Sequence, residues 1–161
     1  MLLETDGGIL LSVPGIGVTL AAELTAGMGD LEAFTNAGQL IKMAGTNPVV
    51  KQSGGKTATH FAISKQGRAP FRGIVYQAGK CTALHNLDMN ARYRKMKEQG
   101  KLTGQAYIAI GNRIVRLAYA RRKHQTLYQS TCADYILQKV IAGKLRNKSK
   151  QAVFFSQFAS V

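Results

Sequence analysis

Between Pro48 and Phe71 the chain gathers the side chains that could do chemistry, and it places no carboxylate among them. No long apolar period runs through this stretch, so we predict a loop rather than a helix. Glycines let a backbone come close to a ligand, and lysine and arginine supply positive charge. Together these residue types indicate a phosphate ligand, and we favour nucleic acid as its source; the alternative is a solvated basic loop. The residues concerned are Ser53, Gly54, Gly55, Lys56, His60, Ser64, Lys65, Gly67 and Arg68.

The charge of the chain is strongly positive and unevenly spread. Its 161 residues carry a net charge of +14, and the pI is about 10.1. Residues 1–50 contain five acids and one base, a net of −4, whereas residues 51–161 contain three acids and 21 bases, a net of +18. A positive field favours polyanions; the alternatives to nucleic acid are an anionic membrane surface and a basic tail. We therefore expect the polyanion-binding surface to come from the part after Val50.

The remaining composition fits one globular domain with a core, since 45% of the residues are hydrophobic. Cys81 and Cys132 are far apart and form no CxxC, which argues against a disulfide framework or a zinc site. Cys81 and His85 have the spacing of half a metal site, but such residues on an apolar face usually belong to a core. No signal peptide precedes Gly7, and no apolar run reaches the length of a membrane span. We expect no membrane association and a cytoplasmic, nucleoid-associated bacterial protein.

The elements before this stretch are predicted to be short helices. Asp6 is a candidate N-cap for a helix over residues 7–12, and the turn from Val13 to Gly17 leads into a second helix over 18–25. This pattern resembles a helix-hairpin-helix, in which Gly15 and Gly17 would offer backbone N–H groups to a phosphate. The alternative is a hairpin that only packs two helices together. Residues 27–34 read as a turn region, and a helix capped by Thr35 or Asn36 follows through residue 44, closed by Gly45.

The elements after this stretch are predicted to be basic helices, so the fold class is mainly α with a small helical bundle. Val49 and Val50 allow a brief extended pairing, but nothing supports a large sheet. Helical spacing begins after Pro70 and runs to His85; Asn86 or Asp88 starts a helix over 89–99. The longest helix is predicted over 103–123. Its apolar stripe is Tyr107, Gly111, Ile114, Val115 and Ala118, and its basic side is Arg113, Arg116, Arg121, Arg122 and Lys123. A further helix over 131–141 and a basic run over 144–150 complete the chain.

Several short motifs occur in an order that is typical of one protein family. They are Pro14-Gly15-Ile16-Gly17, Gln39-Leu40, Ala44-Gly45 followed by Pro48, Gln52-Ser53-Gly54, and Ile63-Ser64-Lys65-Gln66-Gly67. The chain thereby resembles the C-terminal transposase domain of the insertion sequence 110 family, which resembles RNA-guided DNA recombinases directed by a bridge RNA. The resemblance covers residues 11–123. Its most specific part is the Ser-Gly followed by Ile-Ser-Lys-x-Gly.

The resemblance implies a catalytic serine, which falls on Ser53, with Ser64 as the rival nucleophile. Ser53 would attack a DNA phosphodiester and hold the strand as a phosphoserine ester, a step that needs cations or a metal to neutralise charge. Lys51, Lys56 and His60 are near enough in the sequence to assist. The nucleic-acid-binding set that we predict is Gly15, Gly17, Lys51, Lys56, His60, Lys65, Arg68, Arg72, Arg113 and Arg116.

The family's other half is a RuvC-like domain whose acidic residues hold magnesium, and nothing in this sequence replaces it. We therefore predict no metal or cofactor in this chain, Mg²⁺ only with the RuvC-like domain, and a fragment that is inactive alone. The implied partners are DNA, a bridge RNA, and either a second copy or a full-length transposase. The predicted organisation is a stump (1–10), a helix-hairpin-helix part (11–45), a catalytic loop (46–70), basic helices (71–123) and an unassigned tail (124–161). Thr46 and Asn47 read as unremarkable variations.

Two other functions remain open from the sequence. One is a non-catalytic helix-hairpin-helix protein that binds DNA or RNA through the same basic helices, and it would tolerate loss of Ser53. The other is a decayed remnant without activity.

Overall fold

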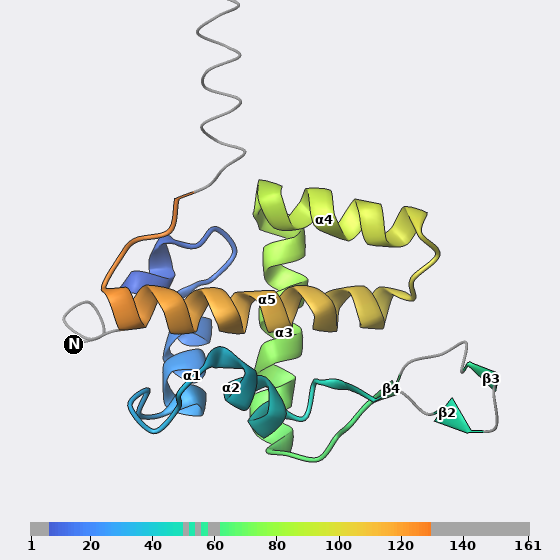
Figure 1. The fold of residues 1–161 in the computed structure, drawn as a ribbon. Coiled ribbons are helices and arrows are strands. Elements are labelled where there is room, and N and C mark those ends of the chain that lie inside the picture. Colours follow the sequence, from blue (N-terminus) through green and yellow to red (C-terminus); the bar gives the residue numbers. More distant parts are fainter. Residues whose placement is uncertain (1–6, 50–51, 54–55, 58–61, 130–161) are drawn as a thin grey trace, which may run out of the picture. The chain divides into compact units, whose positions relative to one another are not determined.

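The structure is a computed structural model that describes residues 7–49, 52–53, 56–57 and 62–129. These residues belong to a unit that ends at Tyr128, apart from Gln129, which begins a second unit. The first unit is mainly helical, as predicted (Figure 1). No helix in the described residues has the length and apolar character needed to cross a membrane. The helices are the 3-10 helix η1 (Gly8–Ser12), α1 (Val18–Met28), α2 (Ala37–Ala44), α3 (Ala69–His85), α4 (Leu87–Glu98) and α5 (Thr103–His124).

The N-terminal hairpin of η1 and α1 is tied to α3 by a close backbone contact. Gly15 sits in the turn with a φ of +92°, and a Cβ at this position would lie 2.8 Å from the carbonyl oxygen of Cys81. Only glycine fits both constraints. The N-cap of η1 is Gly7, with no side-chain cap hydrogen bond, and not Asp6. The hairpin geometry therefore matches the alternative in which the turn packs two elements together.

Helix α1 is longer than the sequence predicts, because it continues to Met28 through part of the expected turn. The physical reason is Gly27, whose missing side chain makes room for the ring of Phe71 from α3. Phe71 is almost fully buried, so this contact fills the space between α1 and α3. Helix formation is thus supported by packing at a residue that has low helix propensity.

Asparagines begin α2 and α4, as predicted, and a glycine ends α2. The side chain of Asn36 accepts a hydrogen bond from the backbone N–H of Gln39, and Gly45 ends α2 with a φ of +67°. The buried side chain of Asn86 accepts from the N–H groups of Asp88 and Met89 at 3.0 and 3.2 Å. These bonds satisfy donors that the first helical turn leaves without intrahelical partners.

The centre of the fold is the crossing of α3 and α5 (Figure 1). A Cβ at Gly79 would collide with the carbonyl oxygen of Tyr107, and a Cβ at Gly111 would collide with that of Val75. The two backbones therefore touch at two places where only hydrogen fits. The most deeply buried apolar side chains around this crossing and the N-terminal elements are Leu10, Leu24, Leu40, Val75, Ile110, Ile114 and Val115.

Residues after α5 return to the N-terminal part of the unit. The backbone N–H of Tyr128 donates to the Ser12 hydroxyl at 2.9 Å, and the Tyr128 hydroxyl donates to a carboxylate oxygen of Asp88 at 2.7 Å. The unit therefore extends past His124, whereas the predicted helix over 131–141 and the basic run over 144–150 lie outside the described residues.

The helix crossing predicts opposite effects for two glycine substitutions on α3. Gly79→Ala should lower the free energy of unfolding by about 1–3 kcal/mol, because the added methyl group must displace the backbone of α5. Gly73→Ala should raise it by about 0.5–1 kcal/mol, because a Cβ there meets nothing within 4 Å and alanine is the better helix former. Urea unfolding followed by circular dichroism measures both, and equal changes would contradict the close approach.

A candidate nucleic-acid site around the Ser53 hairpin

The stretch predicted as a loop contains two short ladders, one following the other. β1 (Pro48–Val49) pairs antiparallel with β4 (Ala62–Ile63), so the brief extended pairing expected at Val49 is present. Farther along the chain, β2 (Gln52–Ser53) pairs antiparallel with β3 (Lys56–Thr57). The register places Ser53 opposite Lys56. The backbone thus brings the predicted nucleophile and one predicted cation together.

We call the whole stretch from β1 to β4 the Ser53 hairpin, and the β1–β4 pair its base. This base is fastened to α5 by the side chains of Thr46 and Asn112. The Thr46 hydroxyl donates to Oδ1 of Asn112 at 2.5 Å, and Nδ2 of Asn112 donates to the carbonyl oxygen of Thr46 at 3.1 Å. Thr46 is 1% exposed and Asn112 is half-buried, so the two bonds are partly shielded from water. Buried polar groups of this kind are costly to leave unpaired.

Asn47 and Ser64 form a second joint where β1 and β4 leave the helices. The Ser64 hydroxyl donates to Oδ1 of Asn47 at 2.8 Å, and the N–H of Ser64 donates to the Asn47 carbonyl oxygen at 3.0 Å. Reading Thr46 and Asn47 as unremarkable was therefore wrong, since both residues anchor the hairpin. Ser64, the rival nucleophile, has a hydroxyl that is engaged in holding the strands.

The segment that follows β4, residues 64–68, is called the return segment. It brings predicted cations together at the junction of α2 and α3. The N–H of Lys65 donates to the carbonyl oxygen of Gly45, and the N–H of Arg68 donates to that of Met43 at 2.8 Å. Gly67 permits this contact, because a Cβ there would collide with the Met43 carbonyl oxygen. The Arg72 guanidinium donates to the Lys65 carbonyl oxygen at 3.2 Å.

The electrostatics around this junction are one-sided. The side chains of Lys65 and Arg68 are exposed, and Arg72 is half-buried. No aspartate or glutamate occurs between Glu32 and Asp88 in the sequence, so the neighbours of these cations along the chain include no carboxylate. A cluster of this kind attracts phosphate.

The structure describes some of the other predicted site residues and not others. Lys51 and His60 lie outside the described residues, and Lys56 is placed by its strand pairing alone. Gly15 is held against α3, whereas Gly17 precedes α1 with open space around its Cα. These two glycines therefore do not share one environment.

The basic side of α5 is narrower than predicted. Arg113 and Arg116 are exposed, as a phosphate-binding role requires. Arg122, however, is only 7% exposed, so its assignment to the solvent side was wrong. Its position continues the buried stripe of Gly111, Val115 and Ala118 at helical spacing, a signal that the sequence already contained.

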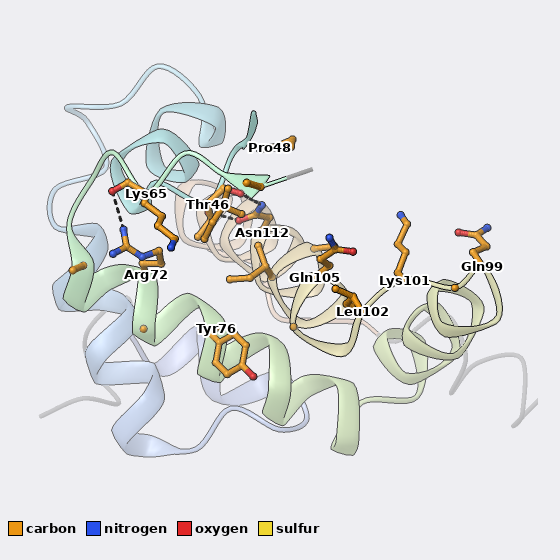
Figure 2. Close-up of a pocket in the computed structure, with 18 residues that line it drawn as sticks. Thr46, Pro48, Lys65, Arg72, Tyr76, Gln99, Lys101, Leu102, Gln105 and Asn112 are labelled. Carbon is orange, nitrogen blue, oxygen red and sulfur yellow. Dashed lines mark hydrogen bonds between the residues drawn. The ribbon is translucent and has the colours of Figure 1, made fainter. Parts of the chain in front are cut away.

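A groove that the sequence did not predict opens beside the base of the hairpin, between α3 and α5 (Figure 2). Its volume is about 1240 Å³, and its lining includes Thr46 and Asn112 of the first joint. Further polar and aromatic lining residues are Lys65, Arg72, Tyr76 and Lys101. No group of three potential metal ligands (His, Cys, Asp or Glu) comes together in the described part of the chain, including around Cys81 and His85.

Comparison with known proteins identifies sequences similar to this chain. Residues 7–94 match the family model described as the transposase IS116/IS110/IS902 family. The 44.8 kDa protein of insertion element IS116 from Streptomyces clavuligerus is 29% identical over 120 residues, which are 74% of this chain and 30% of that protein. The 43.6 kDa protein of insertion element IS110 from Streptomyces coelicolor is 31% identical over 126 residues, 76% of this chain and 30% of that protein.

A third relative is named for the inversion of a gene. The pilin gene-inverting protein of Moraxella bovis is 26% identical over 119 residues, which are 73% of this chain and 37% of that protein. The chain thus spans about a third of the length of the curated relatives that it matches.

The Thr46–Asn112 joint predicts a measurable coupling. Thr46→Val and Asn112→Ala should each lower the free energy of unfolding by about 1–3 kcal/mol, because each removes at least one hydrogen bond from this half-buried joint. The double variant should lose clearly less than the sum, with a coupling of about 0.5–3 kcal/mol in urea unfolding. Thr19→Val, at an exposed position of α1, is the matched control and should have little effect. Additive losses would contradict the joint.

Proposed function

Because the chain belongs to the transposase IS116/IS110/IS902 family, we propose that it is the DNA-binding, serine-bearing domain of an insertion-sequence transposase. The observation that carries this proposal is the hairpin that sets Ser53 opposite Lys56 on an anchored base. The cations of this part of the sequence and its long stretch without a carboxylate support a phosphodiester as the substrate.

In the proposed reaction, Oγ of Ser53 attacks the phosphorus of a DNA phosphodiester. A bond from Oγ to phosphorus forms, and the bond from phosphorus to one deoxyribose oxygen breaks. The serine proton passes to a base, for which Lys51, Lys56 and His60 are the candidates, and the leaving oxygen becomes a free hydroxyl end. The strand is held as a phosphoserine ester, whose reversal by another hydroxyl end completes the transfer. Lys65, Arg68 and Arg72 stabilise the phosphate charge.

The described residues do not fit a magnesium ion, because no three potential ligands gather among them. We therefore assign Mg²⁺ to the RuvC-like domain that the family resemblance implies, and no step of the proposed reaction at Ser53 runs through the metal. The proposal further includes a bridge RNA and either a second copy or a full-length transposase as partners. Acting on a bacterial element would place the chain at the nucleoid in the cytoplasm.

Ser53→Ala tests the nucleophile directly. The full chain is mixed with labelled element-end DNA, bridge RNA, Mg²⁺ and a full-length relative whose own serine has been removed. We expect a covalent protein–DNA adduct on denaturing gels that Ser53→Ala abolishes, because no other hydroxyl replaces its Oγ. Ser64→Ala is the comparison for the rival nucleophile: it should lower the adduct yield only in part, because it loosens the joint with Asn47 but leaves the attacking Oγ of Ser53 in place.

Two outcomes separate the rival functions in this experiment. An adduct that survives Ser53→Ala but not Ser64→Ala would move the nucleophile to Ser64. No adduct from any variant, with DNA binding intact, would favour the non-catalytic nucleic-acid-binding module.

Arg68 offers a test of phosphate binding that does not depend on chemistry. Affinity for DNA should fall steeply with salt, because bound lysines and arginines release counterions from the phosphates. Arg68→Gln should weaken binding and reduce the slope of log affinity against log salt by about one. Fluorescence anisotropy over a salt series measures the slope. Lys80→Gln, an equal charge loss at an exposed position of α3, should leave the slope nearly unchanged; an equal reduction would contradict a localised site.

A further inference from the structure

The groove between α3 and α5 is kept open by small residues on both of its helical walls. A Cβ at Gly73 of α3 or at Gly104 of α5 would meet nothing within 4 Å. Ala69 and Ala109 also line the groove. Glycine inside a helix lowers the stability of that helix. At Gly73 and Gly104 the missing side chain also leaves space free beside the helix. The groove is therefore a built feature of two otherwise well-packed helices.

The charge of the groove is positive on two sides. Lys65 and Arg72 lie at the end near the strands, and Lys101 lies on the connection between α4 and α5 (Figure 2). That connection is held in place by Lys97, whose Nζ donates to the Lys101 carbonyl oxygen at 3.3 Å and to the Thr103 hydroxyl at 3.1 Å. No aspartate or glutamate is among the lining residues. An occupant with repeated negative charge would complement this arrangement.

The groove also contains the aromatic ring of Tyr76, which packs against two further tyrosine rings. Tyr76 is 38% exposed, and its ring makes an edge-on contact with Tyr107 at 5.8 Å between centroids. Tyr107 is itself stacked on Tyr93 at 5.2 Å. The neighbouring Tyr93 hydroxyl, followed by burial, raises the pKa of Tyr107 above its ordinary value. Tyr76 is thereby held ready to stack without having to be ordered first.

The same groove has apolar lining beside the ring. Leu102 is 60% exposed, and Ile108 is half-buried on α5. An apolar surface beside an aromatic ring is complementary to the flat face of a base. In duplex DNA these faces are buried within the base stack. Unpaired bases with their phosphates offer both partners at once, and this combination is how single strands are bound without sequence preference.

We propose that this groove binds single-stranded DNA, with Tyr76 stacking on a base while Lys65, Arg72 and Lys101 contact phosphates. The inference rests on the proposed function for the choice of DNA. Pro48 and Ile63, which pair at the base of the hairpin, also line the groove. A strand held there therefore lies beside the base of the hairpin that carries Ser53, and the groove guides the unpaired strand that strand transfer requires.

Filling the groove tests the proposal without removing a charge. Gly73→Leu in the full chain should keep or raise the melting temperature, because the position is open and helical, but should block the bound strand. We expect its affinity for a labelled single strand of about twelve nucleotides to fall about tenfold or more in fluorescence anisotropy. Ala26→Leu, at an exposed position of α1, is the matched control and should bind as the wild type does.

Tyr76 and Lys101 separate stacking from charge. Tyr76→Ala should weaken single-strand binding about tenfold, whereas Tyr76→Phe should retain it, because only the ring face is needed. Lys101→Gln should weaken binding and lower its salt slope more than Lys80→Gln does. The duplex of the same sequence should be much less sensitive to Gly73→Leu and to Tyr76→Ala than the single strand is.

Wild-type binding of the single strand by Gly73→Leu and Tyr76→Ala would overturn the proposal. So would equal losses for the duplex, tighter groove-dependent binding of an RNA of the same sequence, or displacement of the groove occupant by an acidic peptide alone. The Ser53 adduct assay keeps the two proposals apart. If the Ser53 adduct forms but the groove binds no single strand, only the proposal of single-strand binding is contradicted. If the groove binds the strand but no Ser53 adduct forms, only the proposed catalytic function is contradicted.

Discussion

Helices α3 and α5 meet backbone to backbone at Gly79 and Gly111, and the remaining architecture depends on this contact. The close crossing buries Val75 and Ile114 around it. It also fixes the position of the residue next to Gly111, which is Asn112. Any side chain larger than hydrogen at either glycine would push the helices apart, since a packed interior has little free volume. The hairpin anchor and the groove would then both change.

Asn112 fixes the position of the chain segment that enters β1. Its side-chain amide both donates to and accepts from Thr46, the residue at which the chain leaves α2. The Asn47–Ser64 pair then joins the two strands that continue toward the hairpin. Residues that carry function commonly lie on loops whose ends are held by a rigid scaffold. In this chain the scaffold is the helix crossing, and the fastening is a small set of buried and half-buried hydrogen bonds.

The distribution of charge along the chain is independent support for a polyanion-binding site after Val50. The acidic excess of residues 1–50 lies in the part that includes the turn at Gly15, which packs closely against α3. The positive charge lies after Val50, on residues 65–68 and on the exposed basic residues of α3, α4 and α5. A polyanion would thus be attracted to the part of the chain after Val50, to which the hairpin and the groove belong.

The sequence by itself determined the mainly helical fold and the end of α2 at Gly45, and it narrowed each of two helix caps to a pair of residues that included Asn36 or Asn86, because these features depend on neighbours within a few residues. It also indicated a brief extended pairing at Val49, but not the partner Ala62. Its motif order also identified the family and proposed Ser53. Only the tertiary structure decided that Thr46 meets Asn112, that Arg122 is buried, that α1 continues past Gly27, and that Tyr76 lies in a groove with Lys101. These features join residues that are far apart in the chain or depend on the face that a helix turns to its neighbour. Local propensity and spacing carry no information about such contacts until the helices have packed.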